Sequence, residues 1–191
     1  DQPARPEMPT KPRGVYKTVT ECVAAARQGQ QTWVALPLEK RREIVANIRR
    51  RCAEDVNTLA TMAVEETKLG RVEDKIKKNL LVIHKTPGPE ILQPIAFTGD
   101  DGLTLIERAP YGVIAAITPT TNPTETIICN GIGMISGGNT VVFNTHPSAR
   151  MVSAYCIDLI NRASSELGGP ENIMVAGESP TIESANELLN F

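Results

Sequence analysis

The pattern of apolar residues divides the chain into a helical first half and a second half in which strands alternate with helices. Between residues 38 and 69, five apolar residues recur at intervals of four, four, four and three, which places them on one helical stripe: Ile44, Ile48, Cys52, Val56 and Leu59. This spacing predicts one helix, ended by Gly70, with Cys52 in the core. Helices are also predicted over 18–36, broken by Pro37, and over 72–84, so the region 18–90 is expected to be mainly helical.

After Pro87-Gly88-Pro89 the pattern changes from helical to extended. Short apolar or β-branched runs at 91–98 and 103–108 flank the turn-forming sequence Gly99-Asp100-Asp101-Gly102, which predicts a β-hairpin within the segment 91–109. Beyond it, nearly continuous apolar runs predict three strands, at 112–118, 140–144 and 172–176. The intervening stretches predict three helices, at 123–136, 147–167 and 181–189.

Strands without polar alternation, separated by helices, indicate a parallel sheet that is covered on both faces. The predicted fold class is therefore α/β: a helical lead-in, a β-hairpin, and a doubly wound, Rossmann-like unit over 110–191 with right-handed crossovers. Ligands of such sheets bind beyond the carboxyl ends of the strands. Those ends fall at Thr118-Pro119-Thr120, at Asn144-Thr145-His146 and at Gly177-Glu178.

Residues 1–14 carry prolines at positions 3, 6, 9 and 12, which predicts an extended linker that we take to residue 17. The formal net charge of −2 does not favour a nucleic acid or an anionic membrane as partner. No run of about 18 apolar residues and no secretory leader is visible. The four cysteines form no CxxC pair, so neither a metal site nor a disulfide framework is predicted, and a cytoplasmic location is the default.

The sequence Asn122-Pro123-Thr124-Glu125 is typical of a helix N-terminus. Asn is a favoured N-cap, Pro suits the first helical position, and Glu at the third position completes a capping box. A capping Asn uses its side-chain oxygen and leaves its amide NH2 free to donate. Asn122 therefore has two compatible roles, a helix cap and a donor to a developing oxyanion.

Three other features have plain structural interpretations. Arg49-Arg50-Arg51 is interpreted as a solvated helix face rather than a phosphate site, because acidic residues are interspersed with it. The run from Gly131 to Gly137 approximates a dinucleotide fingerprint, but its third glycine is one residue late and it leads from a helix into a strand. Close helix packing followed by a helix stop is predicted there. Cys129, two turns into the same helix, is predicted to be a buried thiol.

Three segments together carry a resemblance to a known family: ERAPYGVIAAITPTTNPTETIICNGIGMISGGNTVVFNTHPSA (107–149), ETKLGRVEDKIKKNLLVIHKTPGPE (66–90) and LGGPENIMVAG (167–177). The chain resembles the aldehyde dehydrogenase superfamily, and within it the coenzyme-A-acylating propionaldehyde and acetaldehyde dehydrogenases of bacterial microcompartments. The likeness covers residues 18–191.

The resemblance implies a reaction in which a cysteine thiolate attacks an aldehyde, hydride passes to NAD, and the acyl thioester is transferred to coenzyme A. It implies that NAD and coenzyme A use overlapping space in turn. It also places the nucleophilic cysteine and the pyrophosphate-binding turn beyond residue 191, so this stretch alone is expected to be inactive. The hairpin would belong to the oligomerisation element of a dimer or tetramer.

Two departures from the hydrolytic branch of this family concern the site. That branch has Pro-Xaa-Asn-Xaa-Pro, whereas here Thr121 holds the Asn position and Asn122 comes one later, so either side chain, or a backbone N–H, faces the oxyanion. That branch also continues its second strand into Lys-Pro-Xaa-Glu, whose charged residues hold the adenosine ribose. The aligned residues are Asn144-Thr145-His146-Pro147. Their lack of charge fits an adenosine site shared by two cofactors.

The candidate site therefore comprises Asn122 as the catalytic oxyanion donor and two groups of cofactor contacts, namely Thr118, Pro119, Thr120 and Thr121, and Asn144, His146, Pro147 and Ser148. His146 has three alternative roles: the rim of the nucleotide pocket, which the resemblance favours, a structural residue, or an acid–base catalyst.

Two other functional classes remain compatible with the sequence: the aldehyde-oxidising half of a bifunctional alcohol and aldehyde dehydrogenase, and a non-catalytic nucleotide-binding or assembly module. The resemblance further implies a small aldehyde substrate and a location in the microcompartment lumen. It also implies a short targeting peptide ahead of Asp1 that binds the microcompartment shell.

Overall fold

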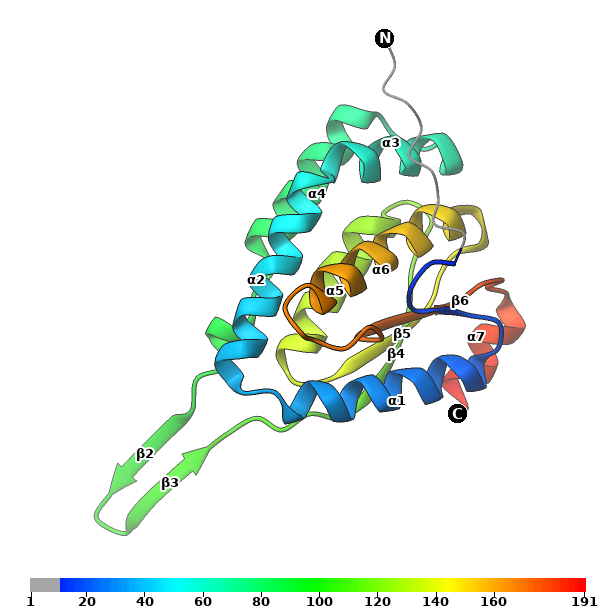
Figure 1. The fold of residues 1–191 in the computed structure, drawn as a ribbon. Coiled ribbons are helices and arrows are strands. Elements are labelled where there is room, and N and C mark those ends of the chain that lie inside the picture. Colours follow the sequence, from blue (N-terminus) through cyan, green and yellow to red (C-terminus); the bar gives the residue numbers. More distant parts are fainter. Residues whose placement is uncertain (1–10) are drawn as a thin grey trace.

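The computed structural model describes residues 11–191, and its centre is a parallel sheet (Figure 1), which has four strands. The strands are β1 (Val15–Tyr16), β4 (Val113–Ile117), β5 (Thr140–Asn144) and β6 (Met174–Gly177), in the spatial order β1-β6-β5-β4. All three neighbouring pairs are parallel. The predicted α/β class with a parallel sheet is therefore confirmed.

Helices cover both faces of this sheet. On one face, α1 (Val19–Ala35) and α7 (Ile182–Leu189) bury a small cluster with Val142 and Val175 of the sheet. On the other face, α5 (Pro123–Ser136) and α6 (Arg150–Ser165) pack over Val141, Phe143 and Met174. A short 3-10 helix, η2 (Pro147–Ala149), leads into α6. Successive residues of a strand point to opposite faces of the sheet, so an uninterrupted apolar run packs against the helices on both faces.

Three further helices, α2 (Leu38–Glu54), α3 (Val56–Thr67) and α4 (Val72–Lys85), form a layer outside α5 and α6 (Figure 1). The prediction of one continuous helix over 38–69 is wrong, because the chain bends at Asp55, whose ψ of 14° ends α2. The Asp55 carboxylate accepts a hydrogen bond of 2.6 Å from the Tyr155 hydroxyl, so the bend is tied to α6. The predicted apolar stripe, Cys52 included, lies in the core as expected.

The prediction that Arg49-Arg50-Arg51 forms a solvated face holds for Arg50 and Arg51, which pair with Glu54 and Glu166 near the surface. It is wrong for Arg49. This guanidinium donates to the carbonyl oxygens of Ile83 and Thr86, the latter at 2.6 Å, and so satisfies the carboxyl end of α4, which the short 3-10 helix η1 (Pro89–Ile91) follows.

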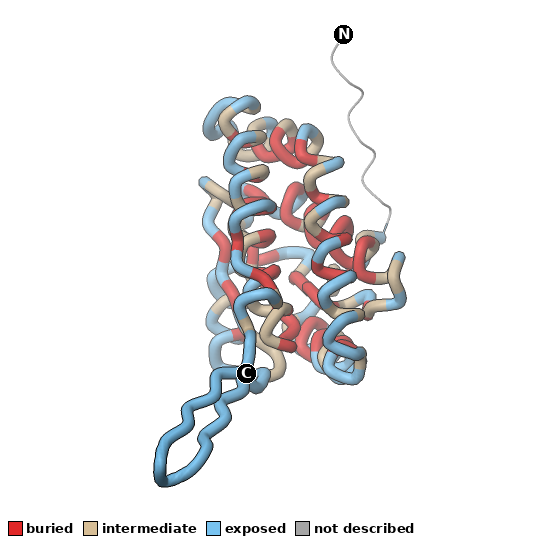
Figure 2. The backbone as a smooth tube through the Cα atoms, turned by 90° about the vertical axis from the view of Figure 1, so that its left-hand side faces the viewer, coloured by how far each residue is buried: buried red, intermediate tan, exposed pale blue. Residues whose placement is uncertain are grey.

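The predicted hairpin is present as β2 (Ile95–Gly99) and β3 (Gly102–Ile106), paired antiparallel across the turn. It projects away from the sheet, and all of its residues are exposed (Figure 2). Five of them are large apolar side chains: Ile95, Phe97, Leu103, Leu105 and Ile106. Such a surface within one chain is typical of a contact with another protein surface.

The N-terminal linker was predicted over 1–17, and residues 1–10 lie outside the described part of the chain. Residues 15–16 form β1, which pairs with the far edge of β6. Gly14 precedes it with a φ of +79°, and a Cβ there would lie 2.5 Å from the Met174 carbonyl oxygen. Only glycine therefore lets the chain approach β6 closely enough to pair.

Candidate functional site

The carboxyl ends of β4 and β5 meet at one edge of the sheet, as the sequence predicts for a parallel pair. Ile117 lies opposite Asn144, and the Thr118 amide donates to the Asn144 carbonyl at 3.2 Å. The two predicted groups of cofactor contacts, Thr118–Thr121 and Asn144 with His146, Pro147 and Ser148, thus begin next to each other. Thr118 is 2% exposed, and neither its hydroxyl nor that of Thr120 has a hydrogen-bond partner among the described residues.

Asn122 precedes α5 but does not cap it through its side chain, so that prediction is wrong. Its ψ of 60° departs from the extended geometry of a side-chain cap, and only its carbonyl takes part, accepting from the Thr126 amide at 3.0 Å. The side-chain oxygen instead accepts from the Lys78 ammonium at 3.3 Å. Because an ammonium group only donates, this contact assigns the oxygen to Lys78 and directs the amide NH2 away from it.

The predicted capping box at Glu125 is also absent. The Glu125 carboxylate is 5% exposed and turns inward, 3.4 Å from the Lys75 ammonium of α4. The Thr124 hydroxyl donates to it at 3.2 Å. The buried cation competes successfully with the backbone amides for this carboxylate, since a buried charge is strongly destabilising without a partner.

The loop after β5 positions His146 at the start of η2. The His146 Nδ1 atom accepts a hydrogen bond of 3.1 Å from the Ser148 amide, which places the proton of the neutral ring on Nε2. Pro147 and Ser148 are exposed, whereas His146 is half-buried. The ring therefore has a structural contact and can present an Nε2–H donor at the edge of the sheet.

Asn144 ties the end of β5 to the start of α7. Its side-chain oxygen accepts from the Ser184 hydroxyl at 2.7 Å, and its NH2 donates to the Thr181 carbonyl at 3.2 Å. Thr181 and Ser184 in turn form a reciprocal cap, with each side chain bound to the other residue's amide. Asn144 is thus a structural residue here, and its cofactor contact remains a prediction.

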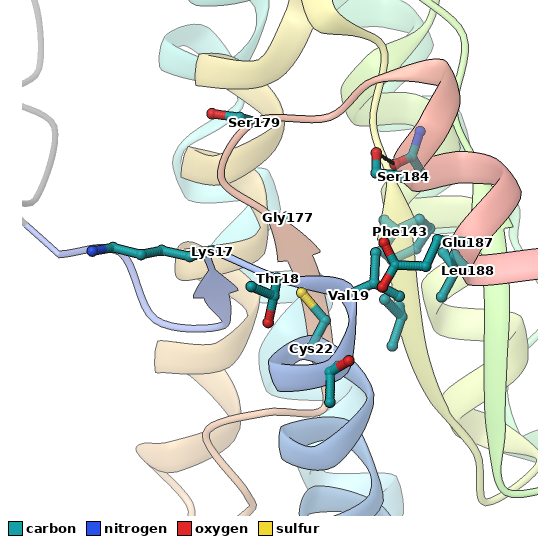
Figure 3. Close-up of a pocket in the computed structure, with 13 residues that line it drawn as sticks. Lys17, Thr18, Val19, Cys22, Phe143, Gly177, Ser179, Ser184, Glu187 and Leu188 are labelled. Atoms are coloured by element: carbon teal, nitrogen blue, oxygen red, sulfur yellow. Dashed lines mark hydrogen bonds between the residues drawn. The ribbon is translucent and has the colours of Figure 1, made fainter.

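A pocket of about 370 Å³ lies between the start of α1 and α7, beyond the carboxyl end of β6 (Figure 3). Residues of α1 and α7 face each other across it, with Cys22 on one side and Glu187 on the other. Burial raises the pKa of the Cys22 thiol to about 11, so this group is a neutral wall of the pocket at physiological pH. The polar lining is completed by Lys17, Thr18, Thr20, Asn144, Ser179 and Ser184.

Most of this pocket lining was missed by the sequence analysis. Asn144 and Gly177 mark strand ends and were identified, but Lys17, Thr18 and Cys22 reach the same edge only because β1 pairs with β6. A two-residue strand has no recognisable pattern. The capping box of Thr18 and Glu21 could have located the start of α1 in the sequence. It could not have shown which strands lie next to that helix end in the fold.

Three of the four cysteines in this chain are poorly suited to nucleophilic attack. Cys22, Cys52 and Cys156 are buried, and burial raises the pKa of each thiol. Cys129 is half-buried, rather than buried as predicted. Among residues 11–191 no group of three or more potential metal ligands gathers, and no helix is long and apolar enough to cross a membrane.

The glycine run in α5 has the predicted structural explanation. A Cβ on Gly131 would lie 2.2 Å from the Met174 side chain, so helix and strand approach closely there. Gly133 faces open space on the exposed side of the helix, and Gly138, with a φ of +87°, follows the helix end. None of these glycines lies in the strand-to-helix turn that a dinucleotide fingerprint needs.

Comparison with known proteins gives consistent results. The model of the aldehyde dehydrogenase family matches residues 4–185. An acetylating acetaldehyde dehydrogenase of Bilophila wadsworthia is 46% identical over 177 residues, which is 93% of this chain and 36% of that protein. The chain therefore spans just over a third of the length of this relative.

Two solved structures are similar at a TM-score of 0.88 and 48% identity. One is a propionaldehyde dehydrogenase from the fucose utilisation microcompartment of Clostridium phytofermentans, and the match covers 91% of this chain and 40% of that one. The other is the Rhodopseudomonas palustris propionaldehyde dehydrogenase with bound propionyl-CoA, with 91% and 39% covered.

Proposed function

Because the chain belongs to the aldehyde dehydrogenase family, we propose that it is the N-terminal portion of an NAD-dependent, coenzyme-A-acylating aldehyde dehydrogenase. The observation that carries this proposal is the identity of 46% to an acetylating acetaldehyde dehydrogenase over 93% of the chain. The bound propionyl-CoA in a structural neighbour supports coenzyme A as the acyl acceptor.

In the proposed reaction, a cysteine thiolate outside this stretch adds to the aldehyde carbonyl, and the resulting hemithioacetal gives a hydride to NAD. The thioester that remains is attacked by the thiol of coenzyme A, which releases acyl-CoA and restores the cysteine. Coenzyme A needs no glutamate base, because a thiol supplies its nucleophilic form near neutral pH far more readily than water does.

This chain contributes the first half of the cofactor domain. The loop Thr118–Thr121 and the residues Asn144, His146, Pro147 and Ser148 line the edge where NAD and coenzyme A bind in turn. Asn122 donates its NH2 group to the oxyanion. Support for Asn122 over Thr121 comes from Lys78, which holds the amide oxygen and so directs the NH2 away from itself.

The substrate is a small aldehyde, acetaldehyde or propionaldehyde, and the full protein works as a homo-oligomer in the lumen of a bacterial microcompartment. The exposed apolar residues of β2 and β3 support a subunit contact through the hairpin. A targeting peptide for the shell, ahead of residue 1, belongs to the same proposal.

The proposal is tested with the full encoded protein by recording NADH formation at 340 nm with propionaldehyde and NAD, with and without coenzyme A. Sustained NADH formation that requires coenzyme A is the expected result. NADH formation at equal rates without coenzyme A indicates a hydrolytic enzyme, and no NADH with propionaldehyde, or with acetaldehyde in its place, contradicts the proposal. The 191-residue chain, as a matched control, is expected to form none.

A further inference from the structure

Lys75 is an unusual residue for the middle of a helical layer, because its ammonium group is buried. It lies on α4 and is 3% exposed, whereas its neighbour Lys77 on the same helix is exposed. Lysine is almost never fully buried without a partner, since removing the charge from water is costly. The contacts of Lys75 therefore show which part of the fold the buried ammonium group stabilises.

The Lys75 ammonium has two partners, one in the loop before α5 and one in the first turn of α5. It forms an ion pair with Glu125 at 3.4 Å, and it donates a hydrogen bond to the carbonyl oxygen of Thr121. The side chains of this pair are 4% and 6% exposed. A charge-assisted hydrogen bond from this buried ammonium to a backbone carbonyl fixes the loop itself, which an ion pair between two helices alone does not.

One turn further along α4, Lys78 makes the second contact with the same loop. Its ammonium donates to the side-chain oxygen of Asn122 at 3.3 Å. Residues three apart share a helix face, so Lys75 and Lys78 approach the Thr121–Asn122 peptide from one side. The first holds the backbone and the second orients the amide.

We propose that Lys75 is a positioning residue, which fixes the Thr121–Asn122 loop so that the Asn122 NH2 group meets the developing oxyanion. Lys78 assists by holding the amide oxygen. This inference rests on the proposed function, because it assigns a purpose to the loop in that reaction. A positioning error of about 1 Å lowers turnover by about 100-fold, so the anchoring of one peptide carbonyl matters to catalysis.

The buried Glu125 carboxylate determines which variants of Lys75 are suitable for the test. Replacing Lys75 alone leaves the Glu125 carboxylate buried without its cation, and the protein is then prone to unfold. The double variant Lys75→Met with Glu125→Gln keeps both side-chain volumes and removes both charges together. It therefore preserves the packing of α4 on α5 and loses the bond to Thr121. Lys77→Met is the matched control, since it changes an exposed lysine of the same helix.

The variants are compared in the full encoded protein by melting temperature and by steady-state kinetics. The double variant is expected to melt within a few degrees of wild type, with kcat lowered by about 10- to 100-fold and the KM for aldehyde changed less than threefold. Lys78→Met is expected to lower kcat by a smaller factor, and Lys77→Met to leave it unchanged. A folded double variant with wild-type kcat overturns the proposal.

Hydrogen exchange in the 191-residue chain tests the positioning without turnover. The Thr126 amide, which donates to the Asn122 carbonyl, is expected to exchange about 10-fold faster in the double variant, while amides of β5 keep their rates. Equal exchange at Thr126 overturns the inference. If wild type makes no NADH yet exchange at Thr126 rises as expected, the proposed function fails and the anchoring of the loop stands.

Discussion

Asn161 gives the sharpest test of how α6 is tied to the start of β6 and to the segment before β1. It lies on α6, is fully buried, and binds β6 from the side opposite β5. Its NH2 donates to the Met174 carbonyl at 2.8 Å and its oxygen accepts from the Met174 amide at 3.2 Å. β1 begins only opposite Ala176, so the Asn161 side chain replaces a strand partner for Met174.

The change Asn161→Ala leaves the buried amide and carbonyl of Met174 without partners. Each unsatisfied buried group costs about 1–3 kcal/mol, so the pair costs about 2–6 kcal/mol. A water molecule that enters the vacated space can rebind one group, which favours the lower half of this range. The NH2 of Asn161 also donates to the Arg13 carbonyl at 3.2 Å, so β1 and the nearby pocket edge loosen together.

The assay is urea unfolding of the 191-residue chain, followed by the fluorescence of its single tryptophan, Trp33, which is buried and donates to the Ile135 carbonyl at 2.8 Å. Asn57→Ala, the same change at an exposed helical position, is the control and is expected within about 0.5 kcal/mol of wild type. Asn161→Asp, nearly equal in size but lacking the donor, is expected to cost at least as much as the alanine change. Equal stability of Asn161→Ala and Asn57→Ala would refute this reasoning.

Three further predictions follow from the core, the glycines and the hairpin. Burial raises the pKa of Cys52 from 9.0 to about 12, so the unfolded chain releases its proton first and stability falls as pH rises from about 9 towards 12. In urea unfolding, the free energy of unfolding of Cys52→Ala is expected to fall by about 2 kcal/mol less than that of wild type between pH 9 and 10.5. An equal fall with pH in both proteins contradicts this. Gly133→Ala is expected to raise the free energy of unfolding by up to about 1 kcal/mol without changing the affinity for NAD. Gly138→Ala, at a residue with positive φ, is expected to lower the free energy of unfolding by about 1–2 kcal/mol. Weaker NAD binding by Gly133→Ala would indicate that the glycine run does bind the dinucleotide. Phe97→Asp is expected to reduce the mass of the full protein in light scattering with an unchanged melting temperature for the 191-residue chain, and an unchanged oligomer argues against a hairpin contact.

Sequence reasoning located elements where local chemistry marks both of their ends. The helix 123–136 and the strand 140–144 were predicted to the residue, because Pro123 starts the helix and Gly137-Gly138 ends it before the strand. The bend at Asp55 was missed, since the apolar spacing continues through it and its cause, Tyr155, is 100 residues away. β1 was missed for the same reason, because its partner β6 lies near the other end of the chain.

The candidate site shows the same limit. The sequence placed Asn122 directly before a helix and located the ends of β4 and β5, because local pattern encodes both. It assigned the Asn122 oxygen to the helix cap, whereas Lys78, 44 residues earlier, takes that oxygen. It likewise assigned Glu125 to a capping box, whereas the buried Lys75 binds the carboxylate. Local propensity could not reveal either contact, because both cations arrive through the packing of α4 against α5.

The central claim is that coenzyme A, and not water, receives the acyl group. Quantifying products by mass spectrometry alongside NADH, with the full encoded protein, propionaldehyde, NAD and coenzyme A, tests it most directly. One propanoyl-CoA formed for each NADH is the predicted result. Free propanoate formed for each NADH, with coenzyme A unconsumed, would contradict the account.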